Sequence, residues 1–260
     1  MIKFFRKIRQ KLLSENKFSK YLLYAIGEIF LVMIGILLAL QVNNWNENRK
    51  DRIQEQTYLK GLLKELESDS RGWSSAIEYT ASITNESKII LEQFSTQNVV
   101  DTALFVNKTF MVGSQLIRRP YIPTYDELLS SGRLSILQND SLKITLRQYM
   151  AIFKMWDNQG DYVQWQSDFA DYKDHIHQYF SPLILTEIGK AVRVSPDSLI
   201  SVEKLNSMGL DLSGYFSDKK SLDHLRKITY THEQLNLLYQ NIHETKLLPL
   251  IDRITREIKE

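Results

Sequence analysis

The chain has 260 residues, of which 43% are hydrophobic and 25% are charged, and its formal net charge is +2. It contains no cysteine, which excludes disulfide bonds, thiol catalysis, cysteine-ligated zinc and a lipoprotein anchor. Its charges nearly balance and its cations gather beside an apolar segment, so the composition argues against nucleic acid as a partner.

Residues 1–20 are predicted to form a basic cytoplasmic arm. They carry seven Lys or Arg residues against a single acidic one, Glu15. An excess of Lys and Arg keeps its side of a span in the cytoplasm, so we expect the N-terminus inside and residues from about 43 onward outside. Apolar residues alternate with these cations, which suits a short amphipathic segment on an anionic lipid surface. An arm that only sets the topology explains the same pattern.

Residues 21–42 are predicted to form a transmembrane helix. The segment reads YLLYAIGEIFLVMIGILLALQV and contains one charged residue, Glu28. About 20 apolar residues, each rising roughly 1.5 Å, are needed to cross a bilayer. A cleaved signal peptide has a shorter apolar region and a small-x-small cleavage site, which the exit after Ala39 lacks. We therefore predict an uncleaved signal-anchor with the lipid bilayer as its partner.

One face of this helix is a candidate interface. Tyr24, Glu28, Gly35 and Ala39 fall roughly on one stripe, and Gly35 and Ala39 form a small-xxx-small pair that permits close helix contact. A carboxylate within a span is costly and is a functional hypothesis by default. We predict a homo-oligomer through this face. The alternative is that Glu28, about two turns from Tyr21, reaches the lipid headgroups.

The remainder is predicted to be all-α. Residues 43–70 continue the span as a helical stalk, and residues 71–260 form an extracytoplasmic antiparallel helical bundle. The apolar periodicity predicts helices over 72–94 and 101–112. Thr124-x-x-Glu127 is a capping-box pattern that predicts the start of a short helix, and Gly132 is placed to end it.

The apolar pattern continues through the second half of the chain. Asn139 and Asp140 are predicted to cap a helix whose repeat passes Val163, after which an aromatic face continues to Phe180. That aromatic face is more typical of bundle core than of a ligand pocket. Residues 192–214 are predicted to be a loop with short helices. A last helix runs from about residue 221, with a kink at Pro249.

Two stretches carry a family resemblance. The basic FRKIR arm, the GEI…IGILLALQ span and the NNWNE exit within residues 1–50 resemble the start of an uncharacterised membrane protein family of the Bacteroidota, defined as a domain of unknown function. Residues 124–134, TYDELLSSGRL, are similar to the family's second recognisable stretch. The resemblance implies an inner-membrane protein of a diderm bacterium with its C-terminal domain in the periplasm. It implies no activity.

The sequence contains no complete catalytic motif. The pairs His232-Glu233 and His243-Glu244 begin like a zinc-protease helix, but Asn236 and Leu247 occupy the places of the second histidine. No phosphate-binding loop and no Gly-x-Ser-x-Gly elbow occurs. We therefore predict a protein that is not an enzyme and that has no cofactor and no metal.

Two further sets of polar residues have competing interpretations. Asp171 and His175 are four residues apart and could both contact a metal, but an ordinary helix-surface pair is the more frequent arrangement. Arg133 follows a helix end and could pair with a carboxylate or bind an anionic group. A helix stop with a buried or capping arginine is the alternative.

Together these features predict a membrane-anchored envelope scaffold, adaptor or accessory subunit that acts through protein contacts. Its expected partners are the bilayer, further copies of itself and an unidentified envelope protein. The alternative is a periplasmic ligand sensor that signals through a partner, because an arm of about 20 residues has no room for a signalling domain.

Overall fold

The structure, a computed structural model, describes residues 18–116, 118–156, 161–194 and 198–259. The predicted basic arm therefore lies outside the described residues, apart from the backbone of 18–20. Every regular element in the described ranges is a helix, which confirms the all-α prediction. In chain order these elements are α2 (Phe18–Thr96), α3 (Thr102–Val112), α4 (Pro123–Ser130), the 3-10 helix η1 (Arg133–Ile136), α5 (Asp140–Trp156), α6 (Asp161–Ile176), α7 (Pro182–Val194), α8 (Val202–Ser207), α9 (Leu212–Ser217), α10 (Lys219–Ile242), the π-helical turn η2 (His243–Leu247) and α11 (Leu248–Lys259).

The chain divides into two compact units, residues 1–57 and residues 58–260. In the first unit the described part is the N-terminal portion of α2. The second unit begins within the predicted stalk, because Leu59, Leu62 and Leu66 have no exposed surface. One face of residues 58–70 thus contributes to the bundle core, and the second unit begins at residue 58.

The core face of α2 follows a seven-residue repeat. Buried positions alternate at steps of three and four from residue 59 to residue 94, the spacing that keeps one face of a helix against its neighbours. Most members are apolar, but the repeat also contains Asp69, Thr80 and Ser87, all buried. The apolar members are Leu59, Leu62, Leu66, Trp73, Ala76, Ile83, Ile90 and Phe94.

α2 continues without interruption through Gly72, so the separate helix predicted over 72–94 is wrong. Glycine weakens a helix interior, which made this position resemble a boundary. Tertiary packing explains why glycine occupies this position, because a Cβ atom at Gly72 would overlap the guanidinium group of Arg118. The glycine leaves room for that side chain to lie against the helix.

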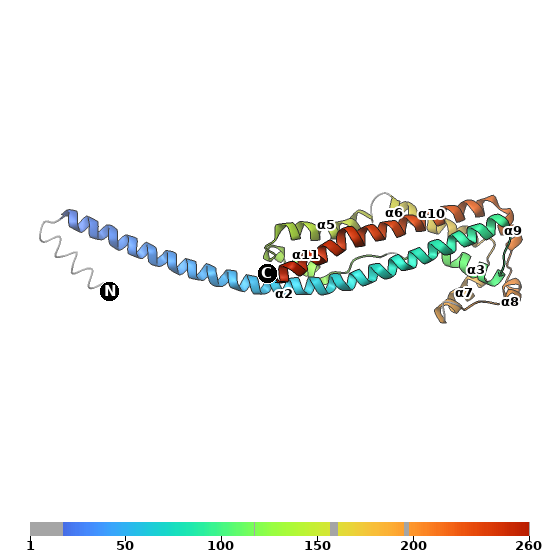
Figure 1. Cartoon of the computed structure of the whole chain (residues 1–260), viewed down its shortest axis with the longest axis horizontal. Coiled ribbons are helices and arrows are strands. Elements are labelled where there is room, and N and C mark those ends of the chain that lie inside the picture. The colour runs from blue at the N-terminus through green and yellow to red at the C-terminus, as the bar shows by residue number, and fades with distance from the viewer. Residues whose placement is uncertain (1–17, 117, 157–160, 195–197, 260) are drawn as a thin grey trace. The chain divides into compact units, whose positions relative to one another are not determined.

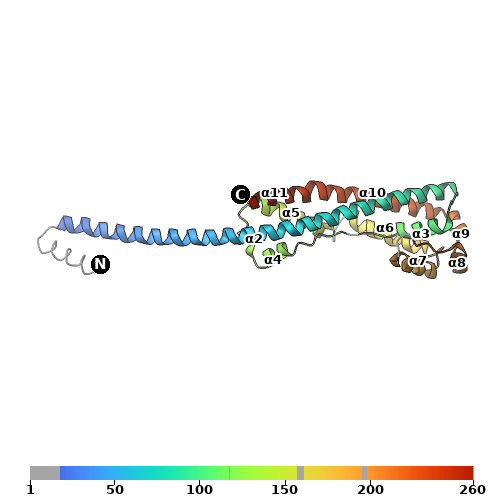
Figure 2. The same cartoon turned by 60° about the horizontal axis from the view of Figure 1, so that its bottom comes forward.

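The last helices run back along the same unit. In both views α10, η2 and α11 lie beside residues 58–96 of α2 and run in the opposite direction (Figures 1 and 2). α6 packs on α10, and α5 packs on α11. This is the antiparallel arrangement that long amphipathic helices with short connections favour.

The predicted disturbance at Pro249 takes the form of a π-helical turn. The backbone N–H of Leu248 donates to the carbonyl of His243, five residues earlier. Proline has no N–H to donate, so the regular ladder cannot continue across this position. The wider turn η2 comes immediately before it, and such turns often lie at functional positions.

Local signals for helix ends have mixed outcomes. The side chain of Asn139 accepts from the N–H group of Leu142 at 3.0 Å, which confirms the cap predicted there. Asp101 caps α3 in the same way, through the N–H group of Leu104 at 3.0 Å. Gly132, which follows the C-cap residue Ser131 of α4, has a φ of 69°, and this confirms its predicted role at the helix end.

The predicted capping box is wrong. Thr124 lies inside α4, and its N–H and hydroxyl both donate to Glu65 of α2, at 3.0 and 2.8 Å. Glu127 instead accepts from the hydroxyl of Tyr58 at 3.0 Å. A carboxylate from a distant helix therefore satisfies the N-terminus of α4, a role that the sequence assigned to the local Glu127.

The aromatic region that was predicted as one helix contains two described helices, α5 and α6. α5 ends at Trp156 and α6 begins at Asp161, and residues 157–160, which include Gly160, lie outside the described residues. Val163, predicted as part of the apolar stripe, is exposed. α8 confirms a short helix within 192–214, and α9 begins in that range and continues to Ser217.

Candidate functional site: an apolar helical segment and a buried polar network

The first candidate site is the apolar segment of α2. From Ala25 this helix is long and apolar enough to cross a membrane, and none of its most apolar stretch is buried. Its large side chains are exposed, with Leu23 at 77% and Leu31 at 68%. Such exposure is unfavourable in water and is expected in contact with lipid. A signal sequence near an N-terminus can meet the same criteria of length and composition, so these properties are consistent with a signal anchor and support membrane association only in general terms.

The predicted interface residues all lie on this segment. Glu28 is half-buried and already has an interaction partner. Gly35 and Ala39 are exposed, and a Cβ atom at Gly35 would meet nothing within 4 Å. The backbone of Tyr24 is helical, but its side chain lies outside the described residues. The face is therefore open at Gly35 and Ala39 in the single chain.

Arg133, the remaining predicted site residue, is the first residue of η1. Its side chain is exposed, and it follows Gly132 at the end of α4. The position leaves the guanidinium group in solvent, so the buried arginine that we considered as an alternative does not occur here.

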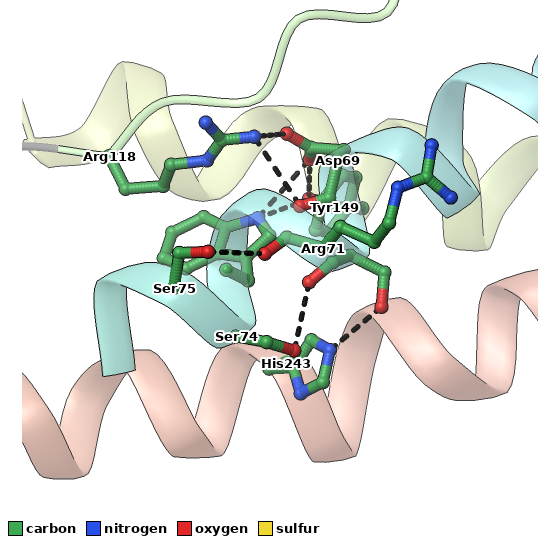
Figure 3. A network of polar contacts seen from close by, with 9 residues as sticks. Asp69, Arg71, Ser74, Ser75, Arg118, Tyr149 and His243 are labelled. Atoms are coloured by element: carbon green, nitrogen blue, oxygen red, sulfur yellow. Dashed lines mark hydrogen bonds and ion pairs between the residues drawn. The ribbon is translucent and has the colours of Figure 1, made fainter. Parts of the chain in front are cut away.

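The second candidate site is a buried polar network that the sequence did not predict. Its centre is Asp69, whose side chain is 1% exposed on the core face of α2. One carboxylate oxygen accepts from Nη2 of Arg118 at 2.6 Å. The other accepts from the hydroxyl of Tyr149 at 2.5 Å and from the indole N–H of Trp73 at 3.2 Å (Figure 3). Three donors thus converge on one buried carboxylate, which is the condition for keeping a charge in a core.

The network joins three parts of the chain. Trp73 and Asp69 belong to α2, Arg118 to the segment between α3 and α4, and Tyr149 to α5. The indole N–H of Trp73 also lies 3.0 Å from the Tyr149 hydroxyl, and Arg118 donates to the backbone carbonyl of Asp69 at 3.3 Å. Removing any one donor would leave the buried carboxylate less satisfied.

The chemistry of the network is that of a structural junction. Burial raises the pKa of Tyr149 far above its ordinary value, and the neighbouring charge of Asp69 adds to the shift. The tyrosine is therefore a permanent hydrogen-bond donor at physiological pH. Asp69 is bonded on both oxygens and enclosed, so it is poorly placed to take a proton from a substrate.

A second contact crosses the bundle one residue along α2. The hydroxyl of Ser70 lies 2.8 Å from Nε2 of His243, the first residue of the π-helical turn (Figure 3). The turn brings this imidazole towards α2. His243 therefore binds across the bundle, and the partial zinc-protease motif that begins with it has a structural role.

The other histidines of the sequence motifs also make contacts within the bundle. Nε2 of His232 lies 2.7 Å from the carbonyl of Val112, and its ring packs edge-on against Phe169. His175 is buried and bonds to Ser221, so it faces α10, whereas Asp171 is exposed. Among the described residues no group of three or more His, Asp or Glu side chains is placed to hold a metal ion.

One comparison with known proteins identifies the family. Residues 28–163 match the model of a family of unknown function, DUF6090, which covers just over half of the chain. The chain belongs to this family. The DUF6090 match includes the apolar segment from Glu28 onward and the whole Asp69 network, and it ends before His175 and His243. No curated protein and no solved structure matches the chain.

A signal for the network was present in the sequence. Asp69 occupies one place of the seven-residue repeat of α2, where a charged residue predicts a buried and paired carboxylate. Nothing local identifies its partners, because Arg118 and Tyr149 are 49 and 80 residues away.

Proposed function

We propose that this protein is a membrane-anchored scaffold, adaptor or accessory subunit of the cell envelope that acts through protein contacts. One observation carries the proposal: the same helix, α2, contains the exposed apolar segment and, from Leu59 onward, the core face of a helical bundle. If the apolar segment crosses the membrane, the bundle is held at the bilayer, because one continuous helix contains both. A tethered bundle of this kind suits the recruitment or positioning of other envelope proteins.

We place the protein in the inner membrane as a single-pass protein with its N-terminus in the cytoplasm and its C-terminal domain in the periplasm. The Lys and Arg excess before the span supports this orientation. Alkaline phosphatase fused to the C-terminus should be active, and a fluorescent protein that folds only in the cytoplasm should be dark there. The opposite pattern would overturn the orientation. Extraction of the full chain from membranes by alkaline carbonate would overturn the span itself.

We further propose that copies of the chain associate through the Glu28, Gly35 and Ala39 face. The absence of native cysteine allows single cysteines to be introduced along residues 21–42 for crosslinking. Crosslinks should peak at these three positions and fall at Phe30 and Met33, which lie on the other side of the helix at about 100° per residue.

Substitutions test the same contact. Gly35→Leu should block close approach and weaken the crosslinks strongly. Glu28→Gln keeps the shape and hydrogen-bonding capacity of the side chain, so it should preserve association; polar contacts within membranes are worth only about 0.6–2 kcal/mol each. A flat crosslinking profile that Gly35→Leu leaves unchanged would mean that the span is only an anchor.

A further inference from the structure

The end of the bundle formed by α6 and the start of α10 contains a stacked pair of histidines. His175 of α6 is 5% exposed, and its ring lies on that of His224 of α10, with centroids 4.6 Å apart and planes at 26°. Nε2 of His175 lies 2.8 Å from the hydroxyl of Ser221 and 3.7 Å from Oδ2 of Asp218. Two imidazole rings in such contact cannot both carry a proton without strong repulsion.

Asp218 connects the two helices beside the histidine pair. Its Oδ1 accepts from the N–H of Lys220 at 2.9 Å and so caps the start of α10. Its Oδ2 accepts from the hydroxyl of Tyr179, in the segment after α6, at 2.7 Å. The carbonyl of Tyr179 in turn accepts from the N–H of Asp211, the cap of α9, at 3.0 Å. One carboxylate therefore links the end of α6 to the start of α10.

Charged groups from both helices surround the pair. The histidines line a cavity of about 390 Å³ together with Gln178. From α6 the carboxylates of Asp171 and Asp174 face the cavity, and from the α10 side Asp218 and Lys220 do so. The carboxylates favour a protonated imidazole, whereas the burial of His175, the stacked ring of His224 and the cation of Lys220 oppose it.

We propose that His175 and His224 form an acid-sensitive joint, in which protonation of His175 loosens the contact between α6 and the start of α10. When His175 is neutral, one ring nitrogen carries a proton and the other accepts, which suits a hydroxyl partner at Ser221. A proton taken from water makes both nitrogens donors and places a cation against His224. The nearest counter-charge, Asp218, is already bonded to Tyr179 and to the start of α10. Nε2 of His175 lies 3.7 Å from Oδ2 of Asp218, beyond hydrogen-bond distance, so a direct bond to the new cation requires the helices to shift.

The direction of the effect follows from linkage. Burial lowers the pKa of His175, the neighbouring His224 and Lys220 lower it further, and Asp218 opposes them. The open joint therefore binds the proton more readily than the closed joint. The closed joint is fully stable above the unfolded histidine pKa of about 6.5 and loses stability as the pH falls below it.

Hydrogen exchange of the full chain in detergent, read by mass spectrometry on peptides covering residues 211–224, tests the joint. Rates are divided by the intrinsic rate at each pH, and peptides from residues 59–94 of α2 serve as the internal reference. Between pH 7.5 and 5 the corrected exchange rate of residues 211–224 should rise by up to about tenfold per pH unit, the slope for uptake of one proton. The rise should end where the pH reaches the lowered pKa of His175 in the closed joint. The reference peptides should change much less.

Three variants separate the joint from general acid effects. His175→Gln should remove most of the pH response, and His224→Gln should reduce it because the stacked partner is lost. His177→Gln is the matched control, since His177 is two residues from His175 and exposed, and it should respond like the unmodified chain. If the His175→Gln variant lost its helical circular dichroism signal at pH 7.5, it would not be folded. The pH response of the His224→Gln variant would then test the proposal. A flat pH response in the unmodified chain, or one that survives in both joint variants, would overturn the proposal. The test does not depend on the proposed scaffold function.

Discussion

Replacing Gly72 with alanine tests the Asp69 network because helix propensity and tertiary structure predict opposite signs. In a helix interior alanine is favoured over glycine by about 1 kcal/mol, so propensity alone predicts a gain in stability. In the structure the new Cβ atom would overlap the guanidinium group of Arg118, with even Nη1 at only 2.5 Å. The guanidinium group must move away, and its 2.6 Å bond to Asp69 is then lost.

The two effects can be compared in magnitude. A hydrogen bond to a charged group contributes about 1.5–3 kcal/mol. Arg118 is 30% exposed and can turn into solvent, whereas the carboxylate of Asp69 stays buried with two neutral donors. Subtracting the propensity gain of about 1 kcal/mol leaves a net destabilisation of about 0.5–2 kcal/mol. The measurement is the free energy of unfolding of the full chain in detergent, from urea titrations followed by far-UV circular dichroism.

Two comparisons make this prediction specific. Gly189 lies within α7, and a Cβ atom there would meet nothing within 4 Å, so Gly189→Ala should stabilise by roughly 0.5–1 kcal/mol. In a chain that already carries Arg118→Ala the obstruction is gone, and Gly72→Ala should then stabilise as well. A coupling of about 1.5–3 kcal/mol between positions 72 and 118 is therefore expected. If Gly72→Ala stabilised the unmodified chain, or if its effect were the same in both backgrounds, the reasoning would be refuted.

Three further changes test other contacts by the same measurement. Tyr149→Phe keeps the ring but removes one donor from the buried carboxylate, and it should destabilise by about 1–3 kcal/mol, whereas a loss below about 0.3 kcal/mol would contradict the network. Glu65→Ala should destabilise by about 0.5–2 kcal/mol because it removes the cap on Thr124, while Glu127→Ala should have a much smaller effect; the reverse order would restore the local capping box. Burial lowers the pKa of His232, so the unfolded chain binds a proton more readily, and stability should fall as the pH drops below about 6.5, by at most about 1.4 kcal/mol per pH unit for this group. His232→Gln should reduce that loss, and an unchanged pH dependence would show that His232 does not cause it.

Features that depend on neighbours along the chain were predicted well. The apolar segment is defined by composition alone, because about 20 consecutive apolar residues have few other uses in a protein. The cap at Asn139 and the left-handed Gly132 involve groups within a few residues of one another. The all-α class follows from a periodicity that repeats along most of the chain.

Features that depend on distant residues were not predicted. Gly72 looked like a helix boundary because its partner, Arg118, comes from another segment. Thr124 and Glu127 form a plausible capping box, yet Glu65 approaches α4 from α2 and takes that role. In each case the local preference amounts to about 1 kcal/mol, which one tertiary contact can outweigh.

The sequence by itself determined that the chain is helical, where its long apolar segment lies and which local residues end several helices. Only the tertiary structure decided which polar residues meet: the donors on Asp69, the pairing of Ser70 with His243 and the stacking of His175 on His224. The physical reason is that secondary structure reflects interactions over three or four residues, whereas a buried polar group is satisfied by whatever partner the packing of helices brings to it.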